Sequence, residues 1–182
     1  MSGIVGDNVA RASGVVASAG GGGKILQIAQ NYWTGTSSQT TGGYATYTDM
    51  SNTVSTITPT AAGSSILIFS NIAFCSTHNG GIRLMADIAG AGYNAIFQGV
   101  AAGSRNTNTY GNPSAVNSAN QYIQSGQFLW TPTYTLTDVL SVKMMGSMEP
   151  STPICINRGD SDTNANNRQR CVSTITLWEV AA

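Results

Sequence analysis

Residues 64–88 read SSILIFSNIAFCSTHNGGIRLMADI, and this stretch decides the fold class. Its first part, residues 64–75, alternates with a period of two, which is the side-chain period of a β-strand. One face would hold Ile66, Ile68, Ile72 and Phe74, and the other face would hold Leu67, Phe69 and Ala73. Because both faces are apolar, we expect a central strand that is buried on both sides.

The second part of the stretch supplies a turn and the clearest strand in the chain. His78-Asn79-Gly80-Gly81 predicts a hairpin turn, because Asn and Gly accept a positive φ. In the strand that follows, residues 82–88, the positions expected to point inward are Ile82, Leu84, Ala86 and Ile88. The positions expected to point outward are Arg83, Met85 and Asp87.

The rest of the chain repeats this pattern of short apolar clusters separated by turn-forming residues. Further strands are expected at residues 24–31, 44–48, 54–57, 95–98, 122–130, 139–145, 154–157 and 172–180. No segment shows a sustained apolar period of 3.6 residues. About eight to ten short strands without helices predict an all-β fold, an antiparallel β-sandwich or jelly roll.

The composition excludes two classes of partner. Only 9% of the 182 residues are charged, and the formal net charge is zero. Nucleic acids and anionic membrane surfaces bind proteins with surplus Lys and Arg, so we expect neither as a partner. The longest apolar stretch, residues 66–74, includes Ser70 and Asn71 and is too short to cross a bilayer, so no membrane insertion is expected.

The low charge also bears on assembly. Edge strands of soluble monomers are usually protected by Lys, Glu or Pro. This chain has two Lys and two Glu in all. Unprotected strand edges and a neutral surface predict that neighbouring copies cover parts of the molecule, and therefore a homo-oligomer.

Residues 1–23 differ from the remainder and are expected to form an extended N-terminal arm. They are small and Gly-rich, and they end in the flexible hinge Gly20-Gly21-Gly22-Gly23. The arm cannot build a core alone, so we expect it to dock on another protein through its apolar residues. These residues are Ile4, Val5, Val9, Val15 and Val16. The start of the chain has no basic n-region, so it is not expected to be a signal peptide, and residues 24–182 form the predicted sandwich domain.

Neither a cofactor nor a metal is expected. The three cysteines are an odd count spaced unlike a zinc site, so we interpret them mainly as buried thiols, with a Cys155–Cys171 pair left open. Residues 160–166 imitate the first half of an EF-hand loop. However, Ala165 replaces the required Gly and Cys171 replaces the bidentate Glu, so a loop of Asx-turns is the favoured interpretation and an ion remains the alternative.

The sequence also gives little support for catalysis. His78 is the single histidine and lies in a predicted turn, with no nucleophile placed near it. Asp160 and Asp162 are the one close pair of carboxylates, and they share a loop instead of facing each other across a cleft. We therefore do not expect an enzyme. The tripeptide Arg158-Gly159-Asp160 matches an integrin motif, but so short a match is interpreted as part of the loop structure.

Three segments carry a resemblance to a known family. Residues 154–180, ICINRGDSDTNANNRQRCVSTITLWEV, resemble the C-terminal segment of a family of tailed-phage virion proteins, which ends in STITLMEV. Residues 24–30, KILQIAQ, are similar to that family's opening KVLQVVQ, and residues 56–68 are similar to its ATITP segment. Trp178 stands where Met is usual and Cys171 where a small residue is usual. Residues 91–130 have no match.

The resemblance covers about residues 24–182 and implies a compact β-sandwich on a tail fibre or another virion appendage. It implies a trimeric structural protein of the virion, assembled in the infected bacterial cytoplasm, which contacts the host surface. A capsid decoration or head-fibre protein, or a tail adaptor without a host ligand, is the alternative. In either case the arm of residues 1–23 would bind other virion proteins.

The unmatched polar loop at residues 101–120 is the predicted host-binding site. Strands carry the fold, so an exposed loop can vary freely. The candidate residues are Asn106, Asn108, Tyr110 and Asn112, with Tyr110 expected to be exposed. Amide groups around one aromatic ring suit a neutral host-surface glycan. A solvated or intersubunit loop is the alternative interpretation.

Overall fold

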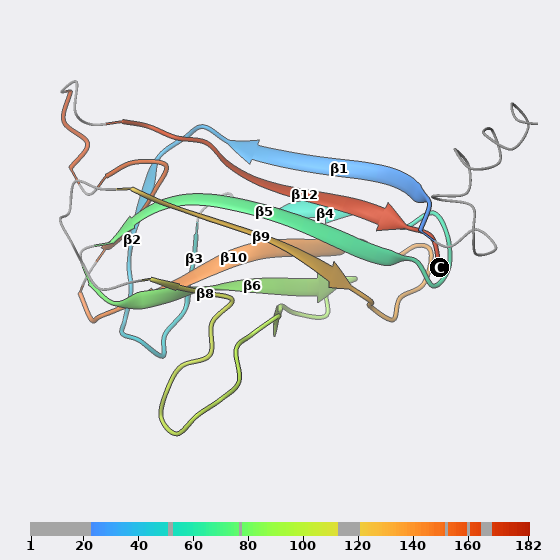
Figure 1. The fold of residues 1–182 in the computed structure, drawn as a ribbon, viewed down its shortest axis with the longest axis horizontal. Helices are drawn as coiled ribbons and strands as arrows, with labels where there is room; N and C mark the ends of the chain where they lie inside the picture. Colours follow the sequence, from blue (N-terminus) through green and yellow to red (C-terminus); the bar gives the residue numbers. More distant parts are fainter. Residues whose placement is uncertain are drawn as a thin grey trace, which may run out of the picture.

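The computed structural model describes residues 23–50, 53–76, 78–112, 121–151, 153–159, 161–164 and 169–182. These residues form twelve strands and no helix. All strand pairs are antiparallel, and the strands form two sheets that stack as layers in Figure 1. The predicted fold class is confirmed: the chain is an antiparallel β-sandwich of the jelly-roll type. The proposed docking residues Ile4, Val5, Val9, Val15 and Val16 lie outside the described residues.

The first sheet, called sheet A, is four strands wide. Its strands are β1 (Ile25–Trp33), β2 (Ser37–Thr40), β5 (Ser65–Ser76), β9 (Tyr122–Trp130), β11 (Pro153–Ile156) and β12 (Ser173–Val180). β1 pairs with β12, β12 with β5, and β5 with β9. β2 pairs with β11, and β11 pairs with the end of β5. β11 therefore lies in line with β12 along the same edge of β5, and β2 lies beside β11 as β1 lies beside β12.

The second sheet, called sheet B, is built around β10. Its strands are β3 (Thr48–Asp49), β4 (Ser55–Ile57), β6 (Gly80–Ile88), β7 (Asn94–Ile96), β8 (Tyr110–Asn112) and β10 (Leu140–Met148). β10 pairs with β3, β4 and β6, and β6 also pairs with β7 and β8. Two strands differ from the sequence predictions. β2 of sheet A forms between residues 31 and 44, where no strand was predicted, and the strand predicted at 44–48 is reduced to β3.

The segment that decided the fold class forms two strands that do not pair with each other. β5 belongs to sheet A and β6 to sheet B. The prediction of a hairpin at 78–81 is therefore wrong, because the chain crosses there from one sheet to the other. Period-two alternation identifies strands and their faces, but it does not say whether two strands lie side by side or face to face.

The core lies between the two sheets and contains the residues predicted to point inward. Ile66, Ile68, Ile72 and Phe74 of β5 face Ile82, Leu84 and Ala86 of β6 and Leu140, Val142 and Met144 of β10, and all are buried. Ile88 is half-buried and packs against this cluster. The other face of β5 differs from its prediction, because Leu67 and Phe69 are only half-buried.

Asp87 was expected to point into solvent, and this prediction is also wrong. Its side chain is 7% exposed. The carboxylate accepts hydrogen bonds from the backbone N–H groups of Gly90, at 2.9 Å, and Gly92, at 2.6 Å. It therefore fixes the turn that follows β6, a local role that Asp often takes.

One buried polar cluster joins β11 to β12. Asn157, in a positive-φ conformation, follows β11, and its Nδ2 donates to the carbonyls of Trp33, at 2.8 Å, and Gly35, at 3.0 Å. The Ser173 hydroxyl donates to Asn157 Oδ1 at 2.6 Å and accepts from the Ala73 N–H at 2.9 Å. These bonds connect the end of β1, the end of β11 and the start of β12 with Ala73 of β5.

The only charged side chain on the strands of sheet A points inward. Glu179 of β12 is 0% exposed, and its carboxylate accepts hydrogen bonds from the backbone N–H groups of Thr60 and Ala61 and from Gln27 Nε2 at 2.8–3.0 Å. Burial raises the pKa of Glu179, but these hydrogen bonds outweigh it, and the pKa lies below its ordinary value. The carboxylate holds the turn before β5 against β12.

Candidate functional site

The predicted host-binding loop is tied to the domain at several points. Asn106 Nδ2 donates to the Tyr44 carbonyl at 2.7 Å, and Asn108 Oδ1 accepts from the Tyr47 hydroxyl at 2.5 Å. Arg83 Nε donates to the Thr107 carbonyl at 2.7 Å. The polar groups at 106–108 therefore contribute to holding the loop over sheet B, and only Asn106 of the candidate asparagines is described as exposed.

The prediction for Tyr110 is wrong. It was expected to be exposed, but its side chain is 8% exposed and lies in β8. Its hydroxyl lies 2.6 Å from Ser70 Oγ, and a Cβ at Gly126 would approach the same oxygen to 2.3 Å. Burial raises the pKa of Tyr110, although the Ser70 hydrogen bond opposes this effect. Tyr110 thus fills the space above Gly126 and links the two sheets, and it presents no surface to a host.

The remaining candidates do not converge on one site. The backbone of Asn112 pairs with Gly80, its side chain is outside the described structure, and so are residues 113–120. His78 lies 3.8 Å from Glu149. Asp162 forms an ion pair of 2.9 Å with Arg170, and Asp160 is not described. The described residues contain no group of three or more His, Cys, Asp or Glu that could hold a metal.

The cysteines are largely buried thiols, as the sequence suggested. Cys75 and Cys155 are buried, and Cys171 is half-buried. Cys155 lies directly opposite Cys75 in the pairing of β11 with β5, so the pairing left open in the sequence, Cys155 with Cys171, is not formed.

A different region has the properties of a binding surface, namely the outward side of sheet A. We call it the sheet A outer face and define it by three rows of residues that cross β1, β12, β5 and β9. The rows are Ile28–Trp178–Leu67–Leu129, Gln30–Thr176–Phe69–Gln127 and Tyr32–Thr174–Asn71–Ser125. Ile123 extends the face beside Ala73.

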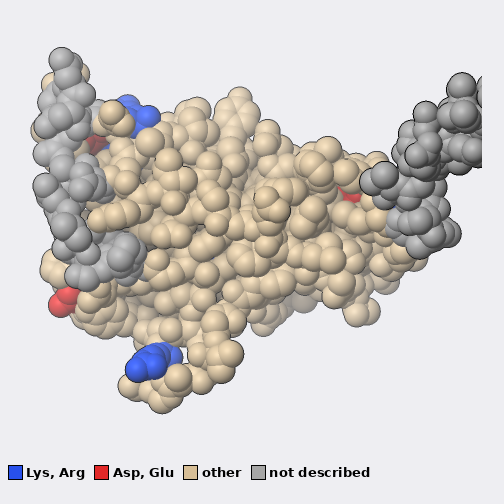
Figure 2. Space-filling view, in the orientation of Figure 1, with Lys and Arg blue, Asp and Glu red and all other residues tan. Residues whose placement is uncertain are grey.

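The sheet A outer face is uncharged and partly apolar. Of the strand residues in sheet A, Glu179 alone is charged, and it points inward. Four large apolar side chains on the two outer strands of the face are more than half exposed: Ile28, Tyr32, Ile123 and Leu129. Figure 2 views the molecule from this side, and the wide middle of the view shows neither basic nor acidic atoms. Such exposed apolar groups mark contact surfaces when they are contiguous.

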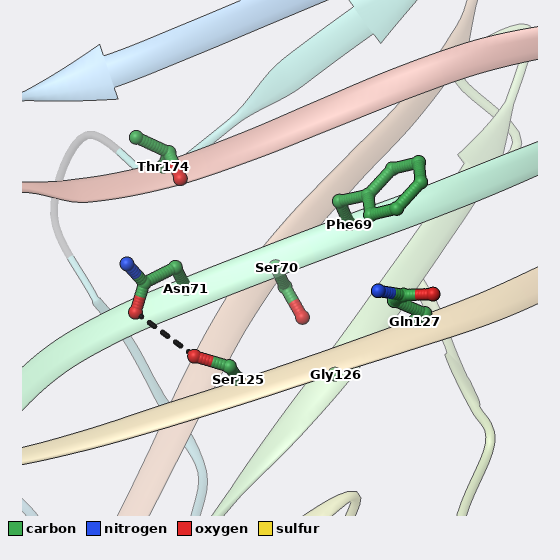
Figure 3. Close-up of a pocket in the computed structure, with 7 residues that line it drawn as sticks. All are labelled: Phe69, Ser70, Asn71, Ser125, Gly126, Gln127 and Thr174. Atoms are coloured by element: carbon green, nitrogen blue, oxygen red, sulfur yellow. Dashed lines mark hydrogen bonds between the residues drawn. The ribbon is translucent and has the colours of Figure 1, made fainter.

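The centre of this face is shallowly hollowed. A depression of about 290 Å³ is lined by Phe69, Asn71, Ser125, Gln127 and Thr174, with the backbone of Ser70 and Gly126 beneath (Figure 3). Ser125 Oγ donates to Asn71 Oδ1 at 3.2 Å. The ring centroids of Phe69 and Trp178 lie 4.8 Å apart, so the two aromatic rings support each other beside the depression.

These groups can form contacts but offer no acid, base or nucleophile of the usual strength. The arrangement therefore suits recognition of a neutral, flat surface. The sequence contained a signal for it. In residues 25–33, 122–130 and 173–180 the outward positions are all neutral, and several are large and apolar.

No protein-family model matches this sequence, and neither does any curated protein sequence. Solved structures with a similar arrangement include Eiger TNF from S. frugiperda, at 11% identity and a TM-score of 0.39, covering 87% of this chain and 94% of that one. Another is the infectious bursal disease virus Gx strain, at 14% identity and a TM-score of 0.38, covering 87% of this chain and 39% of that one. Likenesses at this level carry no argument about function or assembly. The described residues include no helix with the length and hydropathy to span a membrane.

Proposed function

We propose that this chain is a structural protein of a tailed-phage virion, and that it works as a homotrimeric module of a tail fibre or spike. The observation that supports this function is the sheet A outer face, which is four strands wide, neutral and partly apolar. A face of this kind needs a protein neighbour more than a soluble substrate. A structural role through contact, without catalysis, fits it best.

The resemblance to phage virion proteins falls on this same part of the molecule. Residues 154–180 supply β11 and β12, and residues 24–30 supply most of β1. Three of the strands of sheet A therefore come from the segments that resemble the phage family. The trimeric state is carried over from that resemblance.

The positions of the chain ends fit attachment at one end. The Gly23 N–H donates to the Ala181 carbonyl at 3.1 Å, and the Ala181 N–H donates to the Lys24 carbonyl at 2.8 Å. Gly23, the first described residue, thus lies beside the C-terminal end of the domain, on the right in Figure 1. In a fibre, this end would face the virion, and the opposite end, where β11 ends and β12 begins, would face the host.

The test is to locate the chain on the virion. We expect antibody labelling and cryo-EM to find it on the tail, in a copy number divisible by three, with its Gly23 end toward the particle. Chains on the capsid surface would support the decoration alternative, and absence from purified particles would reject both proposals. Deletion of residues 1–22 should prevent incorporation while leaving the melting temperature nearly unchanged.

A further inference from the structure

We infer that the sheet A outer face binds a second copy of this chain, so that β1, β12, β5 and β9 become buried between subunits. The inference rests on the proposed function in one respect, the homo-oligomer, and it adds the surface that forms the contact. The occupant is another copy of the chain, as three observations indicate.

The first observation is the charge of the face. A neutral face can lie against a neighbouring copy, around a threefold axis as well as a twofold axis, without like-charge repulsion and without burying an unpaired ion. The outer side of sheet B differs. Its basic residues Arg83 on β6 and Lys143 on β10 already contact Tyr47, Asp49 and Tyr93 of their own chain, so this side is covered within the monomer.

The second observation is the area. Four strands about 4.8 Å apart, eight to twelve residues long at about 3.3 Å per residue, cover on the order of 600 Å². Two copies would together bury on the order of 1,200 Å², which reaches the range of specific protein interfaces. The face is therefore large enough for stable association.

The third observation is the distribution of side chains. Large apolar groups stand on both margins of the face, Ile28 and Tyr32 on β1 and Ile123 and Leu129 on β9. The strands between them add the Phe69–Trp178 pair and Thr174, and Gln127 stands on β9. Interface cores are enriched in aromatic residues and depleted of charged ones, and this face has both properties.

The experiment places a charge on this face and compares it with the same change on the other sheet. Ile123→Arg and Leu129→Arg change side chains that are 60% and 55% exposed, so folding should tolerate both. Thr56→Arg is the control, because Thr56 is an exposed strand residue of β4 in sheet B. Mass is measured by light scattering on the full chain at micromolar concentration, and far-UV circular dichroism reports the fold.

We expect the native chain and Thr56→Arg to form the same oligomer. Each Arg on β9 should weaken association at least tenfold, because it buries an unpaired charge. Gln127→Glu adds a charge with little change in size and should act in the same direction. If a variant loses its β-sheet spectrum, Gln127→Glu provides the deciding measurement.

Two results would overturn the inference. One is a native chain that stays monomeric. If this monomer binds a neutral disaccharide such as maltose, and Gln127→Ala abolishes that binding, the face binds a sugar instead of a second copy. The other is an oligomer that Ile123→Arg, Leu129→Arg and Gln127→Glu leave intact. Virion labelling separates this failure from that of the proposed function, since a chain can be present in particles while its oligomer uses another surface.

Discussion

The outward side chains of the two sheets differ in charge and in how far the chain itself covers them. Sheet B carries charged residues outward and covers them with its own chain: the Arg83 guanidinium lies 3.7 Å from the Tyr47 ring centre, and Lys143 lies 2.6 Å from Asp49 and 3.9 Å from the Tyr93 ring centre. Sheet A has no outward charge, and its described neighbours leave large apolar side chains exposed. A sandwich can thus finish one side within the monomer and leave the other for a partner.

The largest expected effect concerns the buried hydrogen bonds of Asn157, which join β11 to β12 in sheet A. Asn157→Ala should lower the free energy of unfolding by about 3 kcal/mol, because two backbone carbonyls and the Ser173 hydroxyl lose a buried partner. Alanine also tolerates the positive φ of this position poorly. Chemical denaturation measures the change.

Asn106→Ala is the matched control, since it removes an exposed amide over sheet B. Its cost should stay below about 0.5 kcal/mol. Equal costs for the two variants would show that the cluster at Asn157 is not needed to join β11 and β12.

The next effect concerns the inward charge of sheet A. Glu179→Gln should lower stability by about 2 kcal/mol at neutral pH, because the amide puts a donor where the backbone N–H groups of Thr60 and Ala61 need an acceptor. The folded pKa of Glu179 lies below its ordinary value, so the carboxylate stabilises the fold at neutral pH and loses this effect as the pH falls through the folded pKa.

Thermal melts of both proteins between pH 7 and pH 3 measure this dependence. The stability difference between the native chain and Glu179→Gln should be full at pH 7 and should shrink below about pH 4. A difference that does not change with pH would show that the lost stability comes from packing and not from the charge.

The smallest effect concerns an outward charge of sheet B. Arg83→Met should cost about 1 kcal/mol, through the contact with Tyr47 and the hydrogen bond to the Thr107 carbonyl. Amide hydrogen exchange should speed up mainly at residues 105–109, since Arg83 holds that segment. Arg105→Met, in the same loop but exposed, should change neither quantity. A cost as large as that of Glu179→Gln would remove the contrast between the two sheets.

The sequence predicted what depends on local alternation and missed what depends on distant partners. The inward positions at 66–74 and 82–88 follow from the period of a strand, which neighbouring residues reveal by themselves. The three residues of β8 are too few to show a period, so Tyr110 was placed among exposed loop residues. Its partner Gly126 and the space that Gly126 leaves are visible only after the sheets have formed.

The polar residues show the same limit. Nothing near Asn157 or Glu179 in the sequence distinguishes them from ordinary surface residues, because their partners at Trp33 and Thr60 are more than a hundred residues away. The sequence predicted a covered surface but not its location on sheet A. The shortage of charge predicted covered surfaces, but only the register of β1, β12, β5 and β9 shows that the neutral positions gather on one side.

The nearness of Gly23 to Ala181 has a mechanical consequence. If the domain is held at this end and pulled at the other, where β12 begins, the force runs along the strands. The hydrogen bonds between β1 and β12, which pair from Ile25 to Trp33, would then carry the load together as a shear, instead of opening one after another as in a zipper. Unfolding under force is governed by the unfolding rate constant. A shear arrangement would therefore let the module resist a higher pulling force than its free energy of unfolding alone indicates.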